Sequence, residues 1–129
     1  LSGESGPDPE PVTVERQRRP KRTFGFPAAV KGVPASPNEN GVIEVSIEEL
    51  EHIKINLNDR RAGEFSGWLM VGKKFKRLPI GSTLDNEKGM FYWSPGPGFL
   101  GTFPMIFTQT GPGGKVTYKR VTIHIDPKN

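Results

Sequence analysis

Hydrophobic residues follow a period of two through much of the chain after residue 41. Apolar side chains occupy every second position of residues 53–57, and the pattern returns in residues 103–107. Successive side chains of a strand point to opposite faces, so this alternation predicts strands with one buried face. About seven such segments occur in about 90 residues, a density typical of an antiparallel β-sandwich. We therefore expect an all-β domain without long helices.

The middle of the chain carries the signals of a β-hairpin. Residues 65–71 form a nearly continuous apolar run around Trp68, and the pair Gly72-Lys73 separates them from residues 74–78. Glycine readily takes the positive φ that tight hairpin turns need. Near the C-terminus the apolar parity changes close to Lys119, which predicts a bulge or a strand switch there.

Residues 78–101, LPIGSTLDNEKGMFYWSPGPGFLG, combine turn residues with aromatic residues. Asp85 is expected to cap a tight turn that Gly89 closes in the left-handed conformation. Prolines and glycines at 95–98 predict an irregular crossing between sheets, and Gly101 is expected to permit a close backbone approach. The residues expected to form the turn and the core are Asp85, Gly89, Phe91, Trp93, Gly101, Phe103 and Phe107.

The first 40 residues are rich in proline, with seven prolines among glycine, serine and charged residues. This composition predicts an extended linker or arm over residues 1–40, followed by the sandwich domain over residues 41–129. Four apolar residues interrupt the arm and are candidates for a strand that adds to the open sheet edge of a neighbouring sandwich. They are Val12, Val14, Phe24 and Phe26. Such contacts run head to tail and build a filament unless they close into a ring.

Charge and composition exclude several partners and cofactors. Residues 1–40 carry 6 Lys/Arg and 5 Asp/Glu, net +1, and the remainder carries 12 and 9, net +3, which together give the net charge of +4. Neither part is strongly basic, so a nucleic-acid partner is not expected. No apolar run reaches the length of a membrane span of about 20 residues. The absence of cysteine excludes disulfides and thiolate metal sites.

Catalytic chemistry has few candidate residues in this sequence. His52 and His124 are the only histidines, and no serine sits in a nucleophile elbow. The acids at 48, 49 and 51 are expected to form a solvated face. Asp59, Asp85 and Asp126 are far apart in sequence, whereas calcium needs six or more oxygen ligands. We expect neither an enzyme nor a cofactor or metal site.

Exposed aromatic rings offer a different kind of binding. Trp93 shares a strand face with Phe91 and is expected in the core, whereas Tyr92 points to the opposite face. Tyr92 is therefore a candidate for stacking against the apolar surfaces of sugars, and Trp68 is a second candidate.

Turn and strand residues recur at a fixed spacing in Leu78-Pro79-x-Gly81, Asp85, Gly89-x-Phe91-x-Trp93-x-Pro95 and Gly101-x-Phe103. This pattern resembles bacterial immunoglobulin-like domains related to cadherin repeats. The resemblance covers about residues 65–125 and departs from the family pattern at Ser82, where an aliphatic residue is common, and at Lys88, where threonine is frequent. It implies a seven-stranded sandwich in a secreted or surface-anchored bacterial protein. Most calcium ligands of cadherins are missing.

The sequence thus leads to an immunoglobulin-like, cadherin-like β-sandwich with an extended N-terminal arm. We expect a non-catalytic structural, spacer or adhesive module outside the bacterial cell, which acts through protein partners or self-association. The alternative is a carbohydrate-binding accessory module that uses exposed aromatic residues and takes a polysaccharide as its partner.

Overall fold

The computed structural model describes residues 11–17, 32–58 and 63–127. Within them the chain is all-β, with one short 3-10 turn at Pro112–Gly114 and no α-helix. The strands are β1 (Val12–Gln17), β2 (Val33–Ala35), β3 (Val42–Glu48), β4 (His52–Asn56), β5 (Glu64–Val71), β6 (Lys74–Lys76), β7 (Ser82–Asp85), β8 (Met90–Trp93), β9 (Gly101–Thr110) and β10 (Val116–Asp126).

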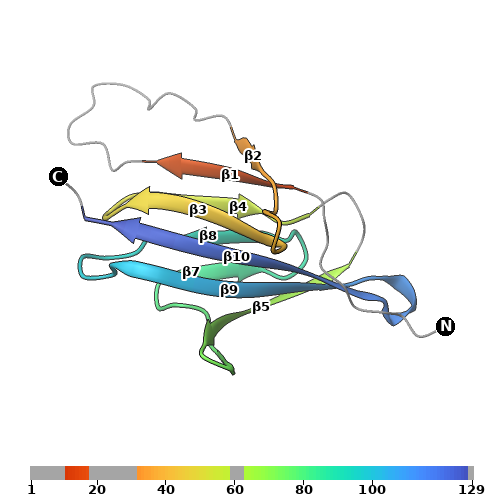
Figure 1. Cartoon of the computed structure of the whole chain (residues 1–129). Coiled ribbons are helices and arrows are strands. Elements are labelled where there is room, and N and C mark those ends of the chain that lie inside the picture. The colour runs from red at the N-terminus through yellow and green to blue at the C-terminus, as the bar shows by residue number, and fades with distance from the viewer. Residues whose placement is uncertain (1–10, 18–31, 59–62, 128–129) are drawn as a thin grey trace.

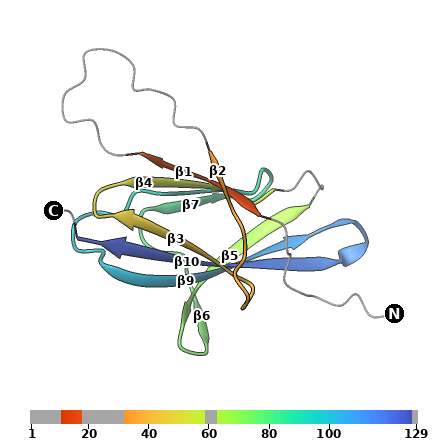
Figure 2. The same ribbon diagram turned by 45° about the horizontal axis from the view of Figure 1, so that its top comes forward.

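The strands form two sheets that pack face to face, which confirms the predicted β-sandwich (Figure 1). The β4 sheet has the strand order β2-β1-β4-β8-β7, and the β10 sheet has the order β3-β10-β9-β5-β6. Neighbouring strands are antiparallel except β3, which pairs with β10 in parallel. In Figure 2 the β5–β6 hairpin projects away from the body of the sandwich.

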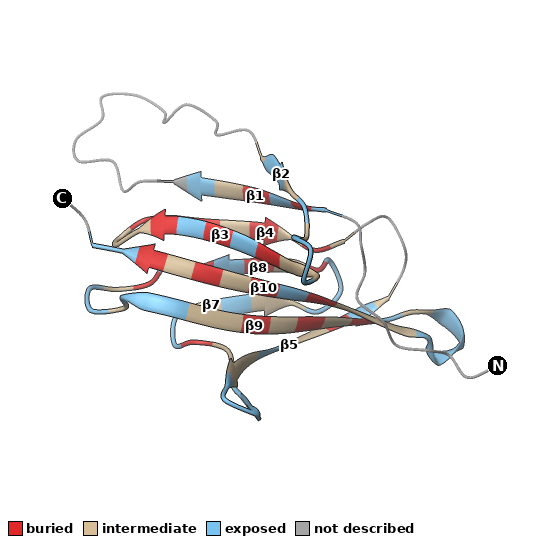
Figure 3. Ribbon diagram, viewed as in Figure 1, coloured by how far each residue is buried: buried red, intermediate tan, exposed pale blue. Residues whose placement is uncertain are grey.

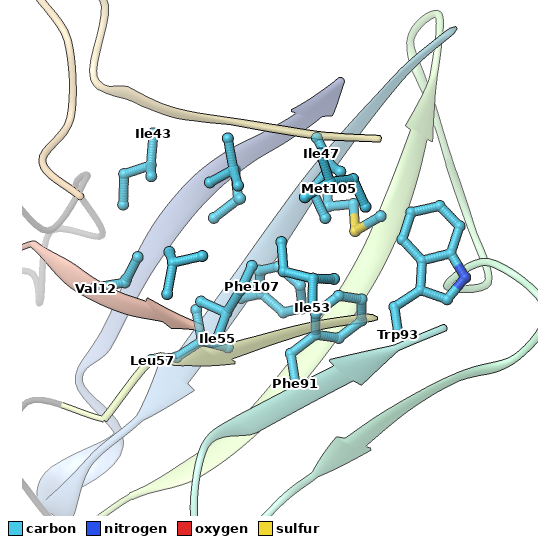
Figure 4. Packing of buried hydrophobic residues seen from close by; sticks show 14 of the residues in the cluster. Val12, Ile43, Ile47, Ile53, Ile55, Leu57, Phe91, Trp93, Met105 and Phe107 are labelled. Atoms are coloured by element: carbon cyan, nitrogen blue, oxygen red, sulfur yellow. The ribbon is translucent and has the colours of Figure 1, made fainter. Parts of the chain in front are cut away.

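Apolar side chains from both sheets fill the space between them (Figure 4). Figure 3 shows buried residues along strands of both sheets. Phe91 from the β4 sheet meets Phe107 from the β10 sheet, with ring centroids 5.1 Å apart. Trp93 is buried and packs edge to face against Phe103, with ring centroids 5.2 Å apart. Its indole N–H donates to the carbonyl of Ile80 at 3.3 Å. Thus Phe91, Trp93 and Phe107 lie in the core, and the partly buried Phe103 packs against it.

The turn between β7 and β8 is built around Asp85 and Gly89. The Asp85 carboxylate accepts the backbone N–H groups of Glu87 and Lys88, each at 3.0 Å. Gly89 has a φ of +68°, and a Cβ there would lie 2.6 Å from the Phe65 ring. Both the backbone conformation and the close packing therefore require glycine at this position.

Gly101 has a different role from the expected close approach. No heavy atom outside its chain neighbours lies within 4 Å of the position that a Cβ would take, but its φ is +107°. The residue is therefore needed for the backbone conformation in which β9 begins.

The expected bulge near Lys119 is wrong. The register between β9 and β10 is continuous from Val116 opposite Thr110 to Ile125 opposite Gly101. Lys119 takes an inward position and is 6% exposed. The sequence suggested a change because the apolar Val116 and Tyr118 were taken to mark the buried face, whereas Lys119 shares the inner face with Val121. A lysine stem can cover apolar surface while its ammonium reaches a polar environment.

Part of the expected arm belongs to the sandwich. β1 pairs with β4 of the same chain, with Val14 opposite Ile55, and β2 pairs with β1. Val12 and Val14 are buried in the core, whereas Phe24 and Phe26 lie outside the described residues. The sandwich therefore includes strands before the expected boundary at residue 41. Proline content suggested a linker, but two alternating valines suffice to place a short strand over apolar surface.

Replacing Trp93 with alanine is predicted to lower the free energy of unfolding by about 3–5 kcal/mol, because a large buried side chain leaves a cavity. Tyr92→Ala, one position along the same strand, is the matched control and should cost less than about 1 kcal/mol, because the ring points to solvent. Urea denaturation of both variants measures the difference. Equal stability of the two variants would contradict the inward direction of Trp93.

Candidate functional site

The β5–β6 hairpin exposes a cluster of large apolar side chains. Trp68 is 37% exposed and Phe75 is 61% exposed, and their ring centroids lie 6.3 Å apart. Val71, beside the turn, is also exposed. Isolated exposed apolar residues are common on soluble proteins, but a contiguous group is typical of an interaction site.

The residues of the turn itself account for this hairpin. Gly72 has a φ of +62° in the two-residue turn, and Val71 pairs with Lys74 directly across it. Continuing the register places Phe75 opposite Met70, on the same outer face as Trp68. The turn therefore brings the two rings together on one side of the β10 sheet.

Positive charges flank Phe75 along the chain. Lys73, Lys74, Lys76 and Arg77 are all exposed, so the stretch Lys73–Arg77 contains four positive charges around a single phenylalanine. We call the exposed side chains of Trp68, Val71 and residues 73–77 the hairpin surface. Clustered charges of one sign attract oppositely charged partners and orient their approach.

A groove lies at the opposite edge of the β10 sheet from β6, between the edge strand β3 and strands β1 and β2 of the β4 sheet. Its volume is about 340 Å³. The side chains of Val14 and Val45 are buried there, whereas Val33 is exposed. We call this the β3 groove, and its lining residues are Val14, Arg16, Val33, Ala35, Glu44, Val45 and Ser46.

Acidic side chains lie along the same edge. Glu44 is exposed, and its carboxylate contacts His124 Nε2 at 3.3 Å. Glu51 corrects the expectation of a solvated acidic face at residues 48, 49 and 51, because it is only 5% exposed. It accepts hydrogen bonds from the Arg16 guanidinium at 2.6 Å and from the backbone N–H of Glu48. This ion pair ties β1 to the loop between β3 and β4.

The two aromatic residues expected to bind sugars lie on different sheets. Trp68 is in β5 of the β10 sheet, and Tyr92 is in β8 of the β4 sheet. Tyr92 is 42% exposed, and Lys54 Nζ lies 5.7 Å from its ring centroid. They cannot form one stacking platform. The ring next to Trp68 is Phe75, which was not among the predicted contact residues. The lysines on both sides of Phe75 are a sequence signal for its exposure.

The remaining candidate residues for chemistry are dispersed. His52 Nδ1, in the β4 sheet, contacts Ser94 Oγ at 2.5 Å, whereas the contact of His124 with Glu44 lies in the β10 sheet. Asp85 caps its turn in the β4 sheet, Asp126 ends β10, and Asp59 lies outside the described residues. Among residues 11–17, 32–58 and 63–127, no three His, Cys, Asp or Glu side chains gather where they could hold a metal ion.

No described helix has the length and hydropathy to cross a membrane. The chain matches no protein-family model, and no curated protein matches it significantly.

The two tryptophans are predicted to respond differently to charged quenchers. In Trp93→Phe, only the exposed Trp68 emits, and the surrounding cations should attract iodide and repel caesium. In Trp68→Phe, only the buried Trp93 emits, and neither ion should quench it strongly. Stern–Volmer constants at low ionic strength measure both effects. Equal quenching of Trp68 by iodide and caesium would contradict a cationic surrounding.

Proposed function

We propose that this chain is a non-catalytic structural or adhesive module that works through protein contacts at the hairpin surface. The module is immunoglobulin-like and belongs to a bacterial extracellular or cell-surface protein. Its partner is bound by apolar and aromatic side chains at the centre of the hairpin surface and by cations around them.

Strand order supports the immunoglobulin-like part of the proposal. Strands β1, β4, β8 and β7 follow the order A-B-E-D of immunoglobulin domains, and β5, β9 and β10 follow the order C-F-G. The short strands β2 and β6 and the parallel strand β3 are then additions at the sheet edges. Together with the turn and core residues between Leu78 and Phe103, this order favours the resemblance to cadherin-like repeats and the extracellular setting that it implies.

The single observation that carries the proposed function is the exposed pair Trp68 and Phe75 among four cations. Aromatic residues supply much of the binding energy at the centres of protein interfaces. Keeping them in water on a projecting hairpin lowers solubility without adding to the core, so a partner that covers them explains their presence.

Carbohydrate binding is the alternative, and the exposed Tyr92 ring favours it. This ring lies on the outer face of β8 beside Lys54. A polysaccharide partner would use this face of the β4 sheet and not the hairpin surface.

Photo-crosslinking on cells that carry the protein tests the proposed function. A photoreactive benzoyl-phenylalanine in place of Phe75 is expected to attach to protein, and the same residue in place of Tyr92 should yield few adducts. Mass spectrometry identifies the attached molecules. Polysaccharide adducts at either position, without protein adducts at position 75, would contradict protein contacts and favour the alternative.

A further inference from the structure

The outer edge of β3 has the geometry of a site for strand addition. The parallel pairing with β10 uses one side of β3, and among the described strands none pairs with its other side. Val42 directs both its backbone N–H and its C=O away from β10, toward Asn38, at 3.1 and 2.9 Å. Backbone groups of alternate residues point to the same side of a strand, so those of Glu44 and Ser46 also point outward. An extended segment beside β3 would find these groups in place.

The β3 groove adds an apolar site next to this edge. Its volume of about 340 Å³ falls at the small end of ligand pockets, about 300–1,000 Å³, and has room for one aromatic side chain. A strand beside β3 would place alternate side chains into the groove and the others on the outer face. On that outer face β3 presents Glu44, Ser46 and Glu48, because Ile43, Val45 and Ile47 point inward.

Strand β6 carries the complementary pattern at the other edge of the same sheet. Its three residues, Lys74-Phe75-Lys76, are all exposed, and β6 is the last strand of the β10 sheet. When Phe75 points into the groove, both lysines point to the face that carries Glu44 and Glu48. The two edges therefore carry opposite charge on this face: Lys74 and Lys76 on β6, and Glu44 and Glu48, on either side of Ser46, on β3. Arg120 lies opposite Val42 at the far end of β3, and Arg16 is paired with Glu51.

We infer that β6 of one copy adds to the outer edge of β3 in a second copy, with Phe75 in the β3 groove and Lys74 and Lys76 against the acidic side chains of β3. The inference rests on the proposed function and names the partner of the hairpin surface as this chain itself. Each copy carries one β6 edge and one β3 edge, so the contact is head to tail. It extends the β10 sheet from copy to copy, as a filament or a closed ring.

Charge exchange in the full chain tests the pairing. Lys76→Glu and Glu44→Lys are each expected to weaken self-association by about tenfold or more, because each opposes like charges across the contact. An equimolar mixture of the two variants should associate again, since each edge then meets an edge of opposite charge. Lys88→Glu reverses a charge at an exposed position in the β7–β8 turn. It is the matched control and should leave association unchanged. Sedimentation velocity over a range of concentrations measures all four samples.

The apolar part of the contact is tested with Phe75→Ser, for which Ile80→Ser is the control because Ile80 is also exposed. Only Phe75→Ser should abolish association, and urea denaturation should give both variants the stability of the parent protein. Because the chain contains no cysteine, Ser46→Cys can also be mixed with Lys74→Cys or Lys76→Cys and oxidised. Disulfide-linked dimers of the mixed variants are expected.

Three outcomes would overturn the inference. The first is that the parent protein stays a monomer at every concentration. The second is that association survives Phe75→Ser, and the third is that the Lys76→Glu and Glu44→Lys variants fail to associate when mixed. Each of these leaves the proposed function standing if position 75 still crosslinks to another protein. Loss of protein crosslinks at position 75 removes the proposed function itself, so the two failures are distinguishable.

Discussion

Burial of one face of each sheet is the constraint on which the rest of this structure depends. Side chains from β4 and β8 meet those from β9 and β10 in one continuous apolar layer, with Phe91 against Phe107 near its middle. A slip of one residue in any of these strands would turn its apolar face to water, so the layer fixes the register of both sheets. The turns then only have to satisfy that register, as Asp85 and Gly89 do between β7 and β8.

Much of this layer was predictable, because alternation is a local property of sequence. Residues such as Phe91, Trp93 and Phe107 occupy positions of the correct parity in short strands bounded by glycine and proline. The same reasoning failed at Lys119, whose long side chain lies on the inner face together with Val121. It also placed residues 1–40 outside the sandwich, since the pairing of β1 with β4 joins segments about 40 residues apart, and no local pattern reports such a pairing.

The candidate site was only partly predictable for a related reason. Exposure of Tyr92 was expected from parity and Trp68 was a second candidate, but their separation on two sheets depends on strand order, which the sequence pattern leaves open. Phe75 became significant only when the hairpin placed its ring beside Trp68. The β3 groove likewise brings together residues from three strands, two of which belonged to the expected arm.

The edges of the β10 sheet connect the fold to the proposed assembly. Sandwiches expose strand edges that pair readily with other chains, and many proteins protect them with charged residues. Here the two edges carry charges of opposite sign, which disfavours pairing of like edges and favours pairing of unlike ones. In the proposed assembly, one charge pattern therefore selects which edges meet.

The most direct test of strand addition at β3 is amide hydrogen exchange at Glu44 and Ser46, followed as the protein concentration rises. Both backbone N–H groups point away from β10 and should exchange rapidly in the dilute monomer. They should become protected at concentrations where the chain associates, while the core amides of β9 remain protected throughout. Rapid exchange at every concentration, in a sample that has associated, would contradict strand addition at β3.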